Sequence, residues 1–198
     1  MIEIILATAN LHKIREFREM FKCLPHFELL SLVQFPHYKA PEETGKTFQE
    51  NALLKAEHAA KTLSKLVLAD DSGLVVPALG GAPGIFSSRY AGENATDAEN
   101  RSKLLDAMRQ IPENERVAYF ECSLALAKPE GLVKSVTASC EGLIGCAPRG
   151  SSGFGYDPLF IKGDYDKTFG ELGDDIKNRI SHRRKAFEKL LVTLETMR

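Results

Sequence analysis

The stretch that most restricts the fold is 66–74, where the apolar run Leu-Val-Leu-Ala meets the adjacent carboxylates Asp70 and Asp71 and then a Ser-Gly pair. The apolar residues predict a buried strand that ends at the carboxylates, and in open α/β sheets ligands bind beyond that end of a strand. Carboxylate oxygens suit Mg²⁺ or Mn²⁺, which usually bind through one or two carboxylates together with substrate phosphates. A polar turn without a ligand is the alternative interpretation of these residues.

Length and charge limit the class of protein. With 198 residues, 43% of them hydrophobic, the chain suffices for one well-buried core and is short for two ordinary domains. A formal net charge of −1 argues against a protein that coats nucleic acid. No stretch approaches the ~20 apolar residues of a membrane span, and the N-terminus lacks the basic region of a signal peptide. We therefore expect a cytoplasmic protein with no nucleic-acid or membrane partner.

The hydrophobic pattern predicts an α/β chain with a mixed sheet flanked by helices. Thr47-x-x-Glu50 and Thr96-x-x-Glu99 match the capping box that opens a helix. Alternating β-formers around a Lys-Pro-Glu-Gly turn predict an antiparallel hairpin. The expected elements are, in chain order, a strand over 2–8, a helix with Ile14, Phe17, Phe21 and Leu24 on its apolar face, a helix over 47–64, a helix from Thr96 through Met108, hairpin strands over 117–127 and 132–144, a strand over 158–161 and a final helix capped by Ser181.

Two polar clusters suit a phosphorylated ligand. At the junction of the first strand and helix, residues 8–13 offer unpaired N–H groups, the positive end of a helix dipole and the charge of Lys13. In 41–55, Glu43 lies in a loop without a structural role, and Asn51 and Lys55 share one helix face at i and i+4. The alternatives are that Asn10 only caps a helix and that Lys13 is solvated.

Two further clusters suit a nucleobase. Residues 150–158 are rich in glycine and carry two aromatic rings, and a ring stacked on a base contributes roughly 1–3 kcal/mol. The basic stretch 177–185 is expected at a helix N-terminus, where positive charge opposes the helix dipole, and a local rule broken in this way often marks a functional site. A structural turn with a packed Phe and a solvated charged face are the respective alternatives.

Missing motifs exclude other kinds of site. The chain has no Gly-x-x-x-x-Gly-Lys-[Ser/Thr] of a P-loop, and Ser72 stands where an aspartyl phosphatase would carry its second Asp. A faint Nudix-like pattern over 15–19 lacks its upstream Glu, because Ala7 occupies that position. The cysteines form no C-x-x-C pair and no zinc-like spacing, so we expect free thiols at Cys23, Cys122, Cys140 and Cys146.

Taken together, the motifs resemble the inosine triphosphate pyrophosphatase family, whose members hydrolyse deaminated purine nucleoside triphosphates. They follow the family's order between residues 5 and 191, which is nearly the whole chain. The matching motifs are Thr8-x-Asn10-x-x-Lys13, Thr47-Phe48-x-Glu50-Asn51-Ala52-x-x-Lys55-Ala56, Ala69-Asp70-Asp71-Ser72-Gly73-Leu74, Gly80-Gly81-Ala82-Pro83-Gly84, Gly153-Phe154-Gly155-Tyr156-Asp157-Pro158 and Ser181-His182-Arg183.

The resemblance implies a single nucleoside triphosphate pyrophosphatase domain over 1–198 with the α/β, ITPase-like (Maf/ITPase) fold, two lobes and a central cleft. It implies a homodimer, Mg²⁺ as the metal with Mn²⁺ as a substitute, and conversion of ITP, dITP and XTP to the monophosphate and pyrophosphate, which cleans the nucleotide pool. Two alternatives stay open: a pyrophosphatase for modified pyrimidine nucleotides, and a nucleotide-sensing binding protein without turnover.

The resemblance also implies a role for each matching residue. Asp71 is the expected catalytic carboxylate and a metal ligand, Glu43 is the second metal ligand, and Asp70 and Glu50 support them. The expected substrate-binding residues near the phosphates are Thr8, Ala9, Asn10, Lys13 and Lys55. The other expected substrate-binding residues are Ser72, Phe154 as the stacking ring, and Gly155, Tyr156, Asp157, Lys177, His182 and Arg183 around the base.

One departure from the family pattern is Ser152, which stands where the family usually has a glycine before Gly153. If this position has a positive φ, serine costs of order 1 kcal/mol and shifts Phe154 slightly. We expect activity to survive the change.

Overall fold

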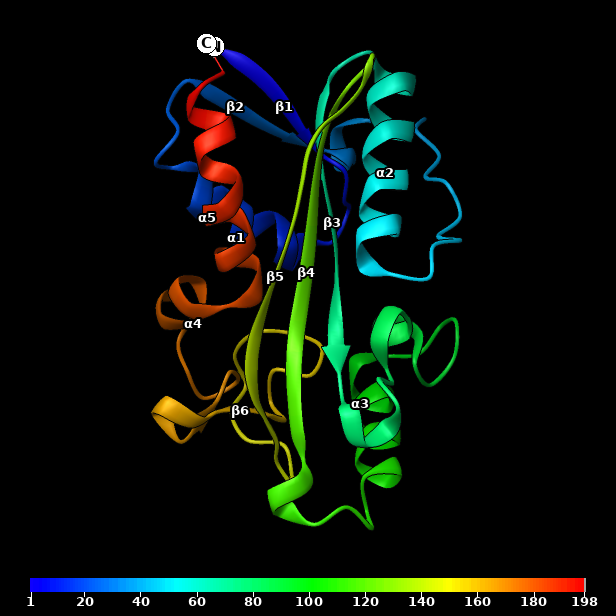
Figure 1. The fold of residues 1–198 in the computed structure, drawn as a ribbon, viewed down its shortest axis with the longest axis vertical. Helices are drawn as coiled ribbons and strands as arrows, with labels where there is room; N and C mark the ends of the chain where they lie inside the picture. Colours follow the sequence, from blue (N-terminus) through cyan, green and yellow to red (C-terminus); the bar gives the residue numbers. More distant parts are fainter. Residues whose placement is uncertain (198) are drawn as a thin grey trace. The chain divides into compact units, whose positions relative to one another are not determined.

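The computed structural model describes residues 1–197 and contains a mixed seven-stranded sheet in the order β2-β1-β3-β4-β5-β6-β7 (Figure 1). Strand β1 pairs in parallel with β2 and β3, and β6 pairs antiparallel with β5 and β7. The strands are β1 (Ile2–Leu6), β2 (Phe27–Ser31), β3 (Leu66–Val75), β4 (Val117–Lys128), β5 (Gly131–Ile144), β6 (Phe160–Lys162) and β7 (Lys167–Thr168). The α-helices are α1 (Leu11–Phe21), α2 (Phe48–Leu63), α3 (Asp97–Ala107), α4 (Asp174–Ile180) and α5 (His182–Glu195). The predicted α/β class with a mixed sheet is confirmed.

The chain divides into two compact units. Unit 1 contains Met1–Asp71, Cys122–Ala138 and the C-terminal segment from Arg183, and unit 2 contains Ser72–Glu121 and Ser139–His182. Strands β3, β4 and β5 therefore contribute residues to both units. The single domain with two lobes and a central cleft stays a prediction.

In unit 1, the alternation of side chains along the strands divides the core into two layers. Figure 1 shows α1 and α5 on one side of these strands and α2 on the other. The layer under α1 and α5 contains Ile4, Leu6, Phe17, Leu68, Leu124 and Phe187. The layer under α2 contains Ile5, Ala7, Val67, Ala69 and Ala125. Unit 1 is thus a sheet with helices packed on both faces.

Four alanines after the first turn of helix α2 allow the helix to pack closely on the sheet. Ala52, Ala56, Ala59 and Ala60 are all fully buried. The helix begins after Thr47, whose hydroxyl accepts the N–H of Glu50, while the Glu50 carboxylate accepts the N–H of Lys46 at 2.6 Å. The predicted helix is confirmed, with half of the expected capping box formed.

Unit 2 has its own apolar core. Helix α3 begins with the predicted capping box, in which Thr96 and Glu99 exchange hydrogen bonds. The core contains Leu74 of β3, Leu104 of α3, Phe120 of β4, Cys140 of β5, and Tyr156, Phe160 and Phe169.

Several predicted boundaries are wrong. Strand β3 does not end at the carboxylates but continues to Val75, because Leu74 is buried in the core of unit 2. Strand β1 ends at Leu6, and β6 begins only at Phe160.

The basic stretch does not lie entirely at a helix N-terminus as predicted. Helix α4 was not expected, and it places Lys177 and Arg179 in its last turn. Positive charge there is favoured by the helix dipole, so the argument from a broken local rule fails for these two residues.

No helix within residues 1–197 is long and apolar enough to cross a membrane. None of the four cysteines, all of which lie in the described part of the chain, forms a disulfide.

We expect Ala56→Leu to lower the free energy of unfolding by about 1–3 kcal/mol, because the larger side chain has no room between α2 and the sheet. Urea unfolding followed by circular dichroism measures the change. The control is Lys61→Leu on the exposed side of the same helix, which should stay within about 0.5 kcal/mol of wild type. Equal losses in both variants would contradict the close packing of α2.

Candidate functional site

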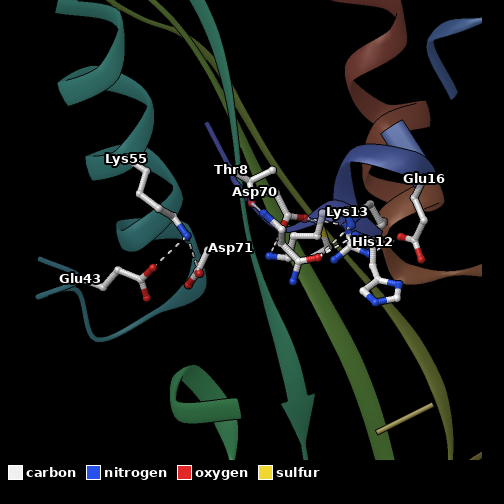
Figure 2. Close-up of polar contacts among 11 residues, drawn as sticks. Thr8, His12, Lys13, Glu16, Glu43, Lys55, Asp70 and Asp71 are labelled. Carbon is white, nitrogen blue, oxygen red and sulfur yellow. Dashed lines mark hydrogen bonds and ion pairs between the residues drawn. The ribbon is translucent and has the colours of Figure 1, made fainter. Parts of the chain in front are cut away.

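Asp70 and Asp71 are consecutive residues inside β3, so their side chains leave the sheet on opposite faces. Asp70 lies on the face covered by α1 and α5, and Asp71 on the face covered by α2. Figure 2 shows the two carboxylates turned apart, with Lys13 at Asp70 and Lys55 at Asp71. The predicted carboxylate pair therefore has different ion-pair partners on the two faces, although the charge of Lys13 still acts on Asp71 and that of Asp70 on Lys55.

Asp70 is the centre of a buried cluster. Lys13 Nζ pairs with its Oδ1, Arg183 Nε donates to its Oδ2 at 2.9 Å, and the Cys122 thiol donates to Oδ2 at 3.0 Å. Arg183 also donates through Nη1 to Glu16. Burial by itself would raise the pKa of Asp70, but Arg183 and Lys13 hold that pKa well below its ordinary value. Asp70 is therefore ionised at neutral pH, and its oxygens are engaged by the protein itself.

Asp71 lies in a second cluster with Lys55 and Glu43. Lys55 Nζ donates to Asp71 Oδ1 at 2.7 Å and to Glu43 Oε1 at 3.3 Å. Burial raises the pKa of Asp71, against the opposing effect of Lys55. Burial alone would lower the pKa of Lys55, but the carboxylates of Asp71 and Glu43 raise it. The cluster thus places a charged ammonium beside a carboxyl that takes up a proton more readily than usual.

The loop that carries Glu43 is fastened to α2. Asn51, which is buried near the start of that helix, accepts the N–H of Gly45 on its Oδ1 at 2.8 Å. A Cβ at Gly45 would collide with Asn51 Oδ1 and with Glu50, so the close approach requires glycine. Lys55 follows one turn after Asn51, so α2 positions Lys55 directly and Glu43 through the loop.

The oxygens of the Asp71 cluster fit a divalent cation. Asp71 Oδ2 is buried and accepts no hydrogen bond from the described residues, and Asn51 Nδ2 is buried there without an acceptor. Within residues 1–197, no group of three or more His, Cys, Asp or Glu side chains is arranged to hold a metal ion. Mg²⁺ commonly uses one or two carboxylates and completes its shell with water and phosphate oxygens. Glu43 and Asp71 therefore suit an ion that binds together with a phosphorylated ligand.

Residues 8–13 adopt the arrangement of a helix cap. Asn10 Oδ1 accepts the N–H groups of His12 at 2.9 Å and of Lys13 at 3.2 Å, and Asn10 N donates to Thr8 Oγ1 at 3.1 Å. Asn10 and the neighbouring Ala9 are exposed, whereas the Lys13 ammonium lies on Asp70. The capping role of Asn10 is thus present, and binding of phosphates by Thr8, Ala9, Asn10 and Lys13 stays a prediction.

In unit 2 the structure brings together most of the residues predicted around the base. Asp157 Oδ2 accepts both the N–H of Phe154 at 2.8 Å and the ammonium of Lys177 at 2.6 Å. Lys177 Nζ also lies 4.6 Å from the centre of the Phe154 ring. Tyr156 donates its hydroxyl proton to the carbonyl oxygen of Ser87 at 2.9 Å.

The glycines of this loop carry its unusual backbone. Gly153 has φ 77° and Gly155 has φ 59°, whereas Ser152 is not among the residues with positive φ. The strain considered for Ser152 therefore does not arise.

His182 and Arg183 are placed differently from the rest of that predicted group. The buried His182 ring stacks on Phe120 in unit 2, with ring centres 4.8 Å apart. Arg183 belongs to unit 1, where its Nε and Nη1 donate to Asp70 and Glu16. Ser72 is half-buried in β3.

Sequence reasoning missed Glu16 and Cys122 as partners in the Asp70 cluster. The spacing of Lys13 and Glu16 at i and i+3 on one helix was available as a signal for Glu16. For Cys122, the signal is the spacing of two residues from Leu124, which puts both side chains on the same face of β4. In the structure this face carries the core layer on the side of Asp70.

The chain is similar over nearly its whole length to proteins of one family. A family model described as the Ham1 family matches residues 4–193. A dITP/XTP pyrophosphatase of Protochlamydia amoebophila is 62% identical and covers 100% of both chains, and one of Chlamydia trachomatis serovar L2 is 48% identical over 99% of this chain and 94% of that protein. A solved HAM1 protein from Coxiella burnetii has a TM-score of 0.89 and 43% identity over 98% of this chain and 99% of that one. The Staphylococcus aureus Ham1 protein has a TM-score of 0.87 and 42% identity over 99% and 100%. These matches confirm the predicted fold.

We expect Asp70→Asn to lower the free energy of unfolding by about 3–5 kcal/mol at neutral pH, because Arg183 stays buried without its full counter-charge. The folded pKa of Asp70 lies below its unfolded value of about 3.9, so its contribution is present above that pH and is lost as the pH falls further. The difference from wild type should therefore be constant from about pH 7 to 5 and narrow below about pH 4.

Urea unfolding at a series of pH values measures this difference. Asp106→Asn, at an exposed carboxylate of α3, is the matched control and should show no such gap. The role given to Asp70 would be contradicted if wild type and Asp70→Asn had the same free energy of unfolding at pH 7, or if their difference were as large at pH 3 as at pH 7.

Proposed function

Because the chain belongs to the Ham1 family, we propose that it hydrolyses non-standard purine nucleoside triphosphates, such as ITP, dITP and XTP, to the monophosphate and pyrophosphate. The names of its relatives support the substrate class. The observation on this chain that supports the proposal is the Asp71 cluster, which combines a buried carboxyl, a second carboxylate and an ammonium with buried polar atoms that have no partner among the described residues.

Glu43 and Asp71 are the proposed ligands of Mg²⁺, with Mn²⁺ as an alternative. Bound there, the ion would supply a coordinated water of lowered pKa and positive charge for the phosphate oxygens. Lys55 holds the two carboxylates near each other through one ammonium, and Asn51 fixes the loop that carries Glu43. The site is thus arranged before the substrate binds.

Asp71 is the proposed general base. It accepts a proton from the attacking water while the water oxygen bonds to the α-phosphorus and the bond from that phosphorus to the pyrophosphate oxygen breaks. Lys55 and Lys13 would offset the charge that develops on the leaving pyrophosphate.

The Phe154 loop is the proposed base-binding element. The Phe154 ring offers a stacking surface, and Lys177 and Asp157 place a donor and an acceptor beside it. Donors that meet the 6-keto oxygen would be left unpaired by the 6-amino group of adenine, and sites of this kind discriminate by about 10⁴-fold or more. His182 stays a candidate for base contact, whereas Arg183 is proposed to act through Asp70 because two of its nitrogens are engaged there and at Glu16.

The protein is further proposed to act in the cytoplasm as a homodimer, with no nucleic-acid or membrane partner. Sedimentation of the purified chain tests the dimer directly. A single species at the mass of one chain would reject it.

The proposed reaction is tested by pyrophosphate release from a panel of nucleoside triphosphates with Mg²⁺. ITP, dITP and XTP should be hydrolysed and ATP hardly at all. Preference for a modified pyrimidine substrate would assign a different pyrophosphatase, and binding of ITP without release would assign a nucleotide-sensing protein.

We expect Asp71→Asn to reduce kcat by about 10²-fold or more while the protein stays folded, because the amide keeps the shape but removes the base. The control is Asp106→Asn, which should leave kcat unchanged because Asp106 is an exposed residue of α3. Melting curves establish that both variants fold. More than a tenth of wild-type turnover in Asp71→Asn would remove Asp71 from the chemistry.

Glu43→Gln should shift the Mg²⁺ concentration needed for half-maximal activity upward by about tenfold or more, because one of two charged ligands is lost. Glu42→Gln, at the exposed neighbouring carboxylate, is the matched control and should not shift it. A Mg²⁺ titration of pyrophosphate release measures both variants. Superimposable titrations would exclude Glu43 as a ligand.

A further inference from the structure

Gly155, which follows Phe154, has both of its backbone groups held by helix α3. Asp97 Oδ2 accepts the N–H of Gly155 at 2.7 Å, and Arg101 Nη1 donates to its carbonyl oxygen at 2.7 Å. Asp97 and Arg101 are four residues apart and therefore lie on one face of α3. All three residues belong to unit 2. We call the two side chains the α3 clamp.

Helix α3 does not require the contacts of the α3 clamp for its own capping or stability. Thr96 and Glu99 already form a complete capping box at the start of α3. Asp97, which is exposed and in the first turn, favours the helix dipole wherever its carboxylate points. Its hydrogen bond to a loop 58 residues away therefore serves the loop.

Gly155 is a position that needs such a constraint. Its φ of 59° lies in the left-handed region, and nothing is found within 4 Å of where a Cβ would stand. Glycine is thus required by backbone conformation and not by crowding, and a glycine with open space around it has other conformations within reach. Two charge-assisted hydrogen bonds select one of them.

The other side of Phe154 is fixed as well. Asp157 Oδ2 accepts the N–H of Phe154 at 2.8 Å, and the Lys177 ammonium lies 4.6 Å from the ring centre. Together with the α3 clamp, these contacts hold the peptide groups before and after Phe154. The direction of the half-buried Phe154 ring follows from the two peptides that flank it.

We propose that Asp97 and Arg101 are positioning residues for base recognition, which hold Gly155 so that the Phe154 ring is presented in the orientation that stacks on a purine. The inference rests on the proposed function and adds two residues to it. A ring that is ordered before binding loses less conformational entropy when the base arrives. The clamp acts on the loop, so its loss should weaken binding of the base and leave binding of pyrophosphate unchanged.

The test compares Asp97→Ala and Arg101→Ala with wild type, using inosine 5′-monophosphate and pyrophosphate as separate inhibitors. The inhibition constant of the monophosphate and the KM for ITP should each rise by about tenfold, within the range that one stacked base contributes. The inhibition constant of pyrophosphate and kcat should stay within about twofold. Equal weakening of both inhibitors, or of neither, would overturn the inference.

Matched controls are available near the other end of α3. Asp106→Ala and Arg109→Ala remove an exposed acid and an exposed base that pair with each other, and they should match wild type. Asp97→Asn retains an acceptor oxygen and Arg101→Lys retains a donor, so both should recover most of the lost affinity. If Arg101→Ala fails to fold, Arg101→Met provides the same comparison, because its side chain is longer but carries no hydrogen-bond donor.

A double-variant comparison distinguishes an effect of Asp97 that passes through the Phe154 ring from a direct effect of Asp97 on monophosphate affinity. In a Phe154→Ala background, Asp97→Ala should produce no further loss of monophosphate affinity, because the clamp acts through the ring. Additive losses would show that the clamp does not work through Phe154. Titration calorimetry with inosine 5′-monophosphate measures binding without turnover, so it tests the role of the α3 clamp separately from the proposed reaction. Unchanged monophosphate affinity in Asp97→Ala would reject the role of the clamp even if wild type releases pyrophosphate. Absence of pyrophosphate release from wild type would reject the proposed reaction, whatever the calorimetry shows.

Discussion

Successive side chains of a β-strand point to opposite faces, and in β3 this alternation separates two adjacent carboxylates that have different environments. Asp70 faces α1 and α5, where Lys13 and Arg183 keep it ionised. Asp71 faces α2, where burial raises its pKa and one of its oxygens accepts no hydrogen bond from the described residues. One strand thus supplies an ionised carboxylate on one face and, on the other, the carboxyl that we propose as the general base.

The Asp70 cluster constrains the position of β3 more than it adds to stability. Its ion pairs set two cations, Lys13 and Arg183, against two carboxylates, Asp70 and Glu16. Desolvation of buried charges offsets most of the attraction between them, whereas loss of one member leaves an uncompensated charge. The cluster therefore ties β3 to α1 and to the start of α5 and so fixes the strand from which Asp71 projects.

Local signals predicted the features that depend on a few neighbouring residues. The helix starts at Thr47 and Thr96 were predictable because a cap and its partner lie three residues apart. Helix α4 was missed because it is seven residues long and its N-cap residue, Gly173, has no side chain that could cap it. The ion pair of Arg183 with Asp70 joins residues 113 positions apart, so no local sequence pattern predicts it. Likewise, the sequence does not distinguish Asp97 and Arg101 from other polar residues of a helix, because their partner Gly155 is distant in the chain.

The contact between Gly45 and Asn51 limits where the protein tolerates insertions and deletions. Since Asn51 fastens the loop to α2 and Lys55 follows on the same helix, the 12-residue separation of Glu43 and Lys55 is fixed by the geometry. An insertion in α2 between Asn51 and Lys55 would turn Lys55 to another side of the helix relative to Asn51, because each added helical residue rotates it by about 100°. Insertions among 36–41, in the loop before Glu43, leave that register intact. Length variation among functional relatives should therefore collect in the loop over 36–41 and be absent between Asn51 and Lys55.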